Sequence, residues 1–101
     1  MTTTVEFHGL IAIIILSGKI DYSTEDEIRD AINKTLSADG VNEIHVNLAD
    51  VTFMDSSGIR ALMNLQKRAD QRRKTLLLKN CSKSIRQVFE IGGFDQMFTI
   101  L

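Results

Sequence analysis

Two adjacent hydroxyl side chains, Ser56 and Ser57, have the types and spacing that chemistry could use. They lie between Asp55 and Gly58, at the start of a segment whose apolar spacing predicts a helix. Asp and Ser are good N-cap residues and glycine permits a tight turn, so one interpretation is simply a helix start. The functional interpretation is a phosphoacceptor. A phosphoryl group on Ser56 adds about −1.5 to −2 charges at a surface turn, where helix amides can stabilise it.

The charges near this turn decide what such a phosphate would do. Asp55 precedes Ser56 directly, and Asp21 is a candidate neighbour, so phosphorylation would make the patch strongly negative. An acidic or apolar docking surface would then be repelled. Arg60 lies four residues after Ser56, on the same face of the predicted helix. It either pairs with the phosphate, or alters which kinase fits, or is a solvated surface arginine.

Other chemistries find little support in the sequence. The two histidines, His8 and His45, fall in a predicted hairpin turn and in a predicted alternating strand, and no Gly-x-Ser-x-Gly elbow surrounds Ser56. No glycine-rich loop precedes a Lys-Ser or Lys-Thr pair. Metal binding would rest on scattered aspartates without close ligand spacing. We therefore expect no catalytic residues, no metal and no cofactor.

Composition narrows the class of protein further. The 101 residues carry 12 Lys and Arg against 13 Asp and Glu, a net charge of −1 that argues against a dedicated nucleic-acid binder. A single cysteine, Cys81, excludes an internal disulfide framework and makes a reduced, cytoplasmic setting the default. The apolar run 10–16 is too short to span a bilayer and lacks the flanks of a signal peptide. We expect it to be a buried strand, with no membrane insertion.

The net charge is close to zero, but acidic and basic residues are distributed unevenly along the chain. Residues 1–59 contain ten acidic and three basic side chains, whereas residues 60–101 contain nine basic and three acidic ones. Two faces of opposite sign can steer a charged protein partner. Solvated surfaces with charges of the expected sign at helix ends are an equally good interpretation.

The elements that must position these residues alternate between strands and helices. Apolar and alternating runs predict strands at residues 5–7, 10–16 (closed by Gly18–Asp21), 44–48 and 75–78, and residues 98–101 form a last short strand or an extended tail. Helical spacing predicts a helix from 23 or 24 that stops at 39–40, a second that opens at 55–58, and a third over 82–91. Residues 50–54 are expected to form the connection into the second helix.

The first helix carries two alternative capping-box spacings, Ser23 with Asp26 or Thr24 with Glu27. No linker or internal repeat divides the chain, so we expect a single domain over residues 1–101. The order β-β-α-β-α-β-α-β predicts an α/β fold, with a single small mixed sheet flanked by about three helices.

The sequence resembles the STAS-domain anti-sigma factor antagonists of bacteria over nearly its whole length. Residues Asn47–Gly58 look like the signature block of that family. Gly18–Asp21, followed by the first helix, is similar to its second conserved region, and Ser84–Gly93 is similar to its third. Together these segments imply the STAS fold, whereas the Asp-Ser-Ser-Gly tetrapeptide alone would be a weak signal.

The resemblance also implies a partner-switching mechanism. In this family the unphosphorylated antagonist binds an anti-sigma factor that is also a serine kinase with a Bergerat-type ATP site, and the sigma factor or another client is released. The kinase then phosphorylates the first serine of the motif, here Ser56, and a metal-dependent serine phosphatase reverses the step. Asp21 matches an acidic residue near the phosphoacceptor, and Asp55 matches the residue before it. Ser57 and Gly58 match the start of the helix.

Position 60 departs from the resemblance, because relatives often carry a small residue where this chain has Arg60. A second function stays open: a structural STAS subunit or accessory of a membrane transporter, of the lipid-transport ATPase type. There the same fold would dock permanently and Ser56 would only cap a helix. The intact Asp55–Gly58 motif, together with Asp21, favours the switch.

Overall fold

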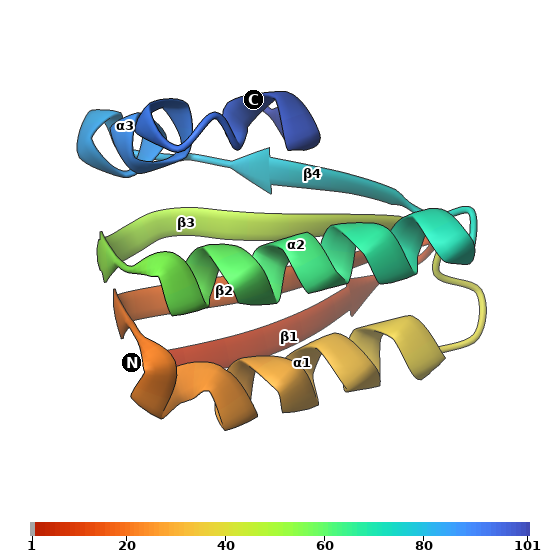
Figure 1. Ribbon diagram of the computed structural model, residues 1–101. Coiled ribbons are helices and arrows are strands. Elements are labelled where there is room, and N and C mark those ends of the chain that lie inside the picture. Colours follow the sequence, from red (N-terminus) through yellow and green to blue (C-terminus); the bar gives the residue numbers. More distant parts are fainter. Residues whose placement is uncertain (1) are drawn as a thin grey trace.

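The apolar segments pair into one sheet, which the computed structural model describes for residues 2–101 (Figure 1). Within these residues the sheet has five strands in chain order: β1 (Thr2–His8), β2 (Ile11–Ile20), β3 (Glu43–Met54), β4 (Thr75–Lys79) and β5 (Thr99–Ile100). β1 is antiparallel to β2, and the later neighbours pair in parallel. The predicted mixed sheet is thereby confirmed.

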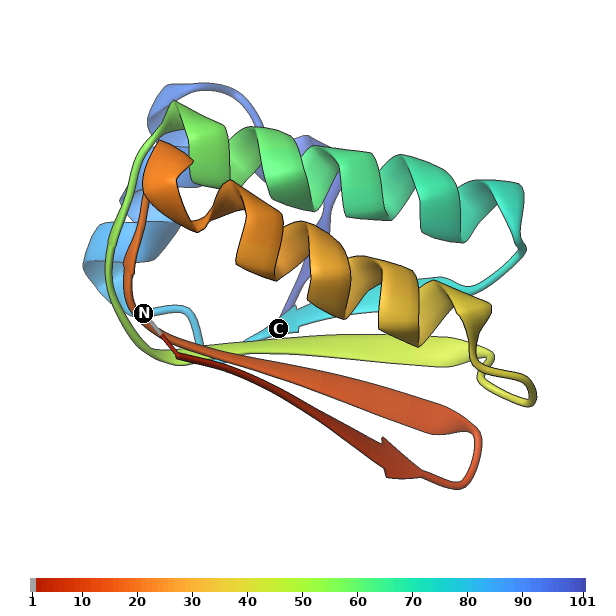
Figure 2. The same cartoon turned by 90° about the horizontal axis from the view of Figure 1, so that it is seen from below.

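Helices connect the parallel strands. The α-helices of residues 2–101 are α1 (Glu25–Ser37), α2 (Ser56–Gln71) and α3 (Lys83–Ile91), with short 3₁₀ turns at Tyr22–Thr24 and Asp95–Met97. α1 and α2 run in the same direction over one face of the sheet (Figure 2), while α3 lies on the β4 side (Figure 1). The predicted element order is confirmed. None of the helices in this part of the chain is long and apolar enough to cross a membrane.

The core fills the space between the sheet and these two helices. Along β2, alternate side chains from Ala12 to Leu16 are buried, and the isoleucines between them are half-buried. α1 supplies Ile28 and Ile32 at helical spacing, and α2 supplies Leu62 and Leu65 in the same way. Because both stripes pack on the same sheet face, the first residues of α2 are held at a fixed place above the strand ends.

β3 is longer than the sequence predicts, and the expected connection at 50–54 is wrong. These residues continue the strand to Met54 and pair with the second half of β2, after two register shifts within Ile15–Lys19. Gly18 has φ +85°, a left-handed backbone that glycine adopts readily at such irregularities. The alternating apolar pattern breaks at the shifts, so the extension depends on the partner strand and on burial of Val51.

The entry into α1 also differs from the prediction. The capping box forms earlier, across the 3₁₀ turn: Asp21 Oδ1 accepts the backbone N–H of Ser23 at 3.0 Å, and Thr24 Oγ1 accepts that of Asp21 at 3.1 Å. Thr24 is the N-cap of α1 but its side chain makes no cap hydrogen bond there. The turn inserted before α1 therefore replaces both predicted spacings and engages the Asp21 carboxylate locally.

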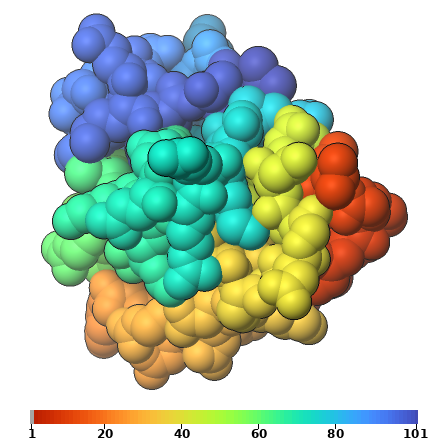
Figure 3. Space-filling view, turned by 90° about the vertical axis from the view of Figure 1, so that its right-hand side faces the viewer, coloured from red at the N-terminus to blue at the C-terminus, as the bar shows by residue number. Residues whose placement is uncertain are grey.

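Basic residues at the end of α2 fasten it to the end of α1. Figure 3 views this end of the molecule, where the last turns of α2 lie beside the segment that follows α1. Three side chains donate hydrogen bonds of 2.6–2.8 Å: Arg68 to Asn33 Oδ1, Arg72 to the carbonyl of Leu36 and Lys74 to the carbonyl of Val41. Carbonyls at a helix C-terminus lack partners within the helix. Three of the basic side chains of residues 60–101 thus make hydrogen bonds within this protein.

Phe89 tests the packing of α3. Its side chain is fully buried, with the ring edge-on to Phe98 at a centroid distance of 5.4 Å. We expect Phe89→Ala to lower the free energy of unfolding by about 3–5 kcal/mol, through lost burial and a residual cavity. Urea denaturation followed by circular dichroism measures the change. Ile91→Ala is the matched control: this side chain is 87% exposed, and its loss should cost less than about 0.5 kcal/mol. Equal losses in the two variants would contradict the packing described.

Candidate functional site

Parallel pairing of β2 with β3 brings two carboxylate residues to one edge of the sheet. Ile20 and Met54 are register partners at the ends of these strands. The backbone N–H of Asp55 donates to the carbonyl of Ile20 at 3.2 Å, so the chain leaves both strands in step. Asp21 and Asp55 therefore follow neighbouring strand ends. The structure brings together two of the residues singled out in the sequence, although 34 positions separate them.

Asp55 starts α2. Its backbone is extended, and its Oδ1 accepts the N–H groups of Ser57 at 2.9 Å and Gly58 at 3.2 Å. A helix leaves its first four N–H groups without partners inside the helix, and this one carboxylate satisfies two of them. The Asp side chain is therefore the cap, and the hydroxyl of Ser56 is not needed for that role.

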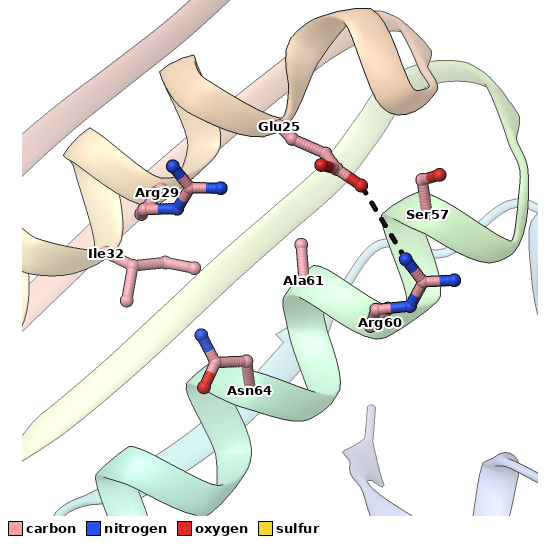
Figure 4. Close-up of a pocket in the computed structure, with 7 residues that line it drawn as sticks. All are labelled: Glu25, Arg29, Ile32, Ser57, Arg60, Ala61 and Asn64. Carbon is pink, nitrogen blue, oxygen red and sulfur yellow. Dashed lines mark ion pairs between the residues drawn. The ribbon is translucent and has the colours of Figure 1, made fainter.

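The two serines point to different surroundings. Ser56 is the first residue of α2 and is exposed, whereas Ser57 is half-buried and lines a groove between α1 and α2 (Figure 4). Successive residues of an α-helix are turned about 100° from one another, which separates two adjacent side chains. Ser56 is thus the hydroxyl of this pair that another protein can reach freely.

Gly58 lies where α2 rests on the sheet. A Cβ at this position would come within 2.7 Å of Ile20 Cγ2 and of Met54 Cγ. The sequence suggested a glycine for a tight turn, but Gly58 is helical and is not among the residues with positive φ. Its function is close approach: the missing side chain lets the first turn of α2 sit directly over the ends of β2 and β3.

The groove between α1 and α2 has a volume of about 370 Å³ and is lined by Glu25, Arg29, Ile32, Ser57, Arg60, Ala61 and Asn64. Arg60 Nη1 lies 4.0 Å from Glu25 Oε1 across this groove (Figure 4). Arg29 pairs instead with Asp26 of its own helix at 3.1 Å. Both pairs are solvated and contribute little to stability. The sequence did not reveal Glu25, because its contact with Arg60 depends on how two helices pack.

The histidines lie at the other end of the sheet from Ser56. His8 pairs with Ile11, which in turn pairs with Glu43 at the start of β3. His45 is nearly buried in the same part of β3, and its Nε2 lies 2.9 Å from Glu43 Oε1. At about 3.3 Å per residue, the strand from His45 to its end spans roughly 30 Å. A Ser-His-Asp assembly at Ser56 is therefore excluded.

The structure also gives no support to a metal site or to a reactive thiol among residues 2–101. Within residues 2–101, no three His, Cys, Asp or Glu side chains are grouped to hold a metal ion. Burial raises the pKa of the Cys81 thiol, and the positive charge of Arg86 opposes this only in part. A thiol with a raised pKa is a weaker source of the reactive thiolate at neutral pH.

The family comparison agrees with this architecture. The STAS domain model matches residues 2–101, and the chain belongs to the STAS domain family. An anti-sigma-B factor antagonist of Staphylococcus epidermidis is 28% identical over 85 residues, which are 84% of this chain and 78% of that protein.

Solved structures share the fold. The anti-sigma factor antagonist SpoIIAA, in its unphosphorylated form, matches with a TM-score of 0.77 at 24% identity, over 99% of this chain and 87% of that one. The phosphorylated form of SpoIIAA, described as a Bacillus cell fate determinant, gives a TM-score of 0.76. A sulfate transporter family protein of Wolinella succinogenes gives 0.75 at 18% identity, over 86% of this chain and 70% of that one. The predicted STAS fold is confirmed.

The cap at Asp55 yields a prediction. Asp55→Ala removes the acceptor of the Ser57 and Gly58 N–H groups, so we expect the free energy of unfolding to fall by about 0.5–2 kcal/mol. Asp55→Asn keeps an equivalent cap and should stay close to the parent protein. Urea denaturation of the three proteins measures both effects. If the Asn variant loses as much stability as the Ala variant, the cap is not what Asp55 contributes.

Gly58→Ala tests the close approach. Alanine favours a helix over glycine by about 1 kcal/mol, but the new methyl group would overlap Ile20 and Met54, and overpacking costs about 1–3 kcal/mol. We expect the overlap to win and the variant to be less stable than the parent. Asn64→Ala, at an exposed position of the same helix, is the control and should not destabilise. A Gly58→Ala protein more stable than the parent would refute the tight contact.

Proposed function

We propose that this protein is an anti-sigma factor antagonist that works by partner switching. In the unphosphorylated state, the surface around the start of α2 binds an anti-sigma factor that is also a serine kinase with a Bergerat-type ATP site. Binding releases the sigma factor or another client. The residues that form or adjoin this surface are Asp21, Asp55, Ser56, Ser57, Gly58 and Arg60. The names of the curated relatives support the proposal.

One observation carries the phosphorylation step: Asp55 caps α2, and Ser56 stands exposed beside it. A helix whose cap is the carboxylate does not lose its cap when the neighbouring hydroxyl is modified. Phosphate at this first position also faces the positive end of the helix dipole, which tolerates negative charge. Ser56 is therefore a position where a large charge can be added while the fold persists.

The phosphoryl transfer needs only an acceptor from this chain. The kinase moves the γ-phosphoryl group of ATP to Ser56 Oγ: the Oγ–P bond forms, the bond to the β-phosphate oxygen breaks, and ADP leaves. The hydroxyl proton passes to a base of the kinase. A metal-dependent serine phosphatase hydrolyses the Oγ–P bond with water and releases inorganic phosphate. In this scheme the protein is not an enzyme, needs no cofactor of its own and acts in the cytoplasm, where ATP is available.

Dissociation follows from charge. Phosphate brings about −1.5 to −2 charges to a surface that already contains Asp55 and Asp21. Both carboxylates accept hydrogen bonds from their own turns, which holds them at the strand ends. A partner surface that is complementary to a neutral hydroxyl is then faced with a concentrated negative charge, and like-charge or unpaired contacts of this kind favour release.

The alternative, a permanent subunit of a membrane transporter, assigns Ser56 the role of a helix cap. In the structure that role belongs to Asp55. The likeness to a sulfate transporter family protein extends to the fold, and it favours neither function. Partner identity separates the two: affinity purification yields a soluble ATP-binding protein under the switch, and a membrane ATPase under the alternative.

Substitutions at Ser56 test the switch. We expect Ser56→Ala to hold the partner kinase persistently, because it offers no phosphoacceptor. Ser56→Asp should weaken binding at least about tenfold, which corresponds to about 1.4 kcal/mol of charge repulsion. Calorimetric titration of the purified partner, with and without ATP, measures both.

Ser57→Ala is the matched control for these variants. It removes the adjacent, groove-facing hydroxyl and should still dissociate on incubation with ATP. Equal affinity of the Ala and Asp variants at position 56 for an identified partner would contradict the mechanism.

A further inference from the structure

Arg60 faces the Glu25 carboxylate across the groove and follows Ser56 by four residues on α2. Its Nη1 is 4.0 Å from Glu25 Oε1, which is long for a hydrogen bond, and its side chain is 75% exposed. A solvated pair of this kind is weak, so a stronger anion within reach of the guanidinium displaces the carboxylate. The bridge between α1 and α2 at this end of the groove is therefore breakable.

Ser56 is within that reach. It lies one helical turn before Arg60, and residues four apart on a helix have Cβ atoms about 5–6 Å from each other. Helical side chains lean toward the N-terminus, so the stem of Arg60 points back over the first turn of α2. Figure 4 shows its guanidinium at this turn, near Ser57 and aimed at Glu25. Rotation of the Arg60 side chain brings the same group to the Ser56 position.

Arg60 is also well placed by charge. Between residues 56 and 66 it is the single charged side chain of the sequence, while the residues that flank the helix start include the carboxylates of Asp21 and Asp55. Arg29, the other arginine of the groove, lies on α1 and faces Asp26 of its own helix, with Nη1 3.1 Å from Asp26 Oδ1. A phosphate on Ser56 therefore meets one cation on its own helix face and carboxylates on the sheet side.

We propose that Arg60 binds the phosphate of phosphorylated Ser56 and, in doing so, leaves Glu25. This inference rests on the proposed function, because it requires a phosphoserine at position 56. A phosphate offers three strong acceptor oxygens and close to two charges, and the planar guanidinium binds such a group in a bidentate manner. The single, distant carboxylate oxygen of Glu25 is the weaker competitor.

The exchange gives the phosphate a second effect. Arg60 neutralises part of the charge at Ser56, and Glu25 at the start of α1 loses its counter-charge. The change in surface potential then extends from α2 to α1, across the mouth of the groove. A partner that contacts only the beginning of α1 would sense phosphorylation without touching Ser56.

The test uses the full chain with phosphoserine placed at position 56 by genetic code expansion, so that no kinase is needed. Phosphorus NMR follows the second ionisation of the phosphate, which has a pKa of about 6 in an unperturbed phosphoserine. A bound guanidinium favours the dianion. We expect the titration midpoint of the parent to lie about 0.2–0.4 pH units below that of Arg60→Ala. Arg60→Lys should recover part of the difference, and Arg29→Ala should leave the midpoint unchanged.

A double-mutant cycle tests the exchange itself. Glu25→Gln lowers the midpoint by removing a nearby negative charge and, where Arg60 is present, by freeing its guanidinium. We expect a larger shift in the Arg60 background than in the Arg60→Ala background. Equal midpoints for the parent and Arg60→Ala would overturn phosphate binding by Arg60. Equal effects of Glu25→Gln in the two backgrounds would overturn its release from Glu25.

The experiments distinguish failure of the Arg60–phosphate contact from failure of the partner switch. The phosphorus titration needs no partner, so a midpoint difference supports the Arg60 contact even if phosphorylation does not alter partner binding. Loss of the partner on phosphorylation together with identical midpoints would keep the switch and discard the Arg60 contact. Arg60 is mostly exposed, and circular dichroism of each variant verifies that it is folded.

Discussion

The first turn of α2 rests directly on the side chains at the ends of β2 and β3, because Gly58 has no side chain of its own, and the geometry of the site depends on this contact. Gly58 leaves the space, and Ile20 and Met54, partners in the parallel ladder, fill it. Interiors are close-packed, so a helix seated in this way cannot shift without opening a void or a clash. The contact fixes where the helix begins, and with it the position of each side chain around the exposed serine.

At the start of α2, Asp55 and Ser56 have different roles. The Asp55 carboxylate satisfies backbone N–H groups, which is a structural task, while Ser56 has no structural task of this kind. With the tasks separated, the proposed phosphorylation of Ser56 would leave the cap of α2 intact, which matters in a marginally stable domain where one or two kcal/mol count. A serine that served both as cap and as phosphoacceptor would couple the modification to the stability of the helix.

The sequence predicted much of this, and its failures have physical causes. Element order and the start of α2 follow from local signals: apolar periodicity and a run of capping residues. The extension of β3 to Met54 does not, because it depends on a partner strand with irregular register. The turn capped by Asp21 displaced both predicted capping boxes. The contact between Glu25 and Arg60 depends on how α1 and α2 pack, so the sequence of neither helix alone predicts it.

The hydrogen bonds that join the far ends of α1 and α2 make the two ends of α1 unequal in how firmly they are attached to α2. Arg72 donates to the carbonyl of Leu36 in the last turn of α1, and Lys74 to that of Val41 in the segment that follows, whereas the first turn of α1 meets α2 through the loose Arg60–Glu25 ion pair. A tilt of α1 that keeps the Arg72 hydrogen bond would pivot near Leu36 and be largest at Glu25, where it would work against the packing of Ile28 in the core. The helix is about 20 Å long at 1.5 Å per residue, so a tilt of about 5° displaces its first turn by roughly 1.7 Å while the far end stays in place.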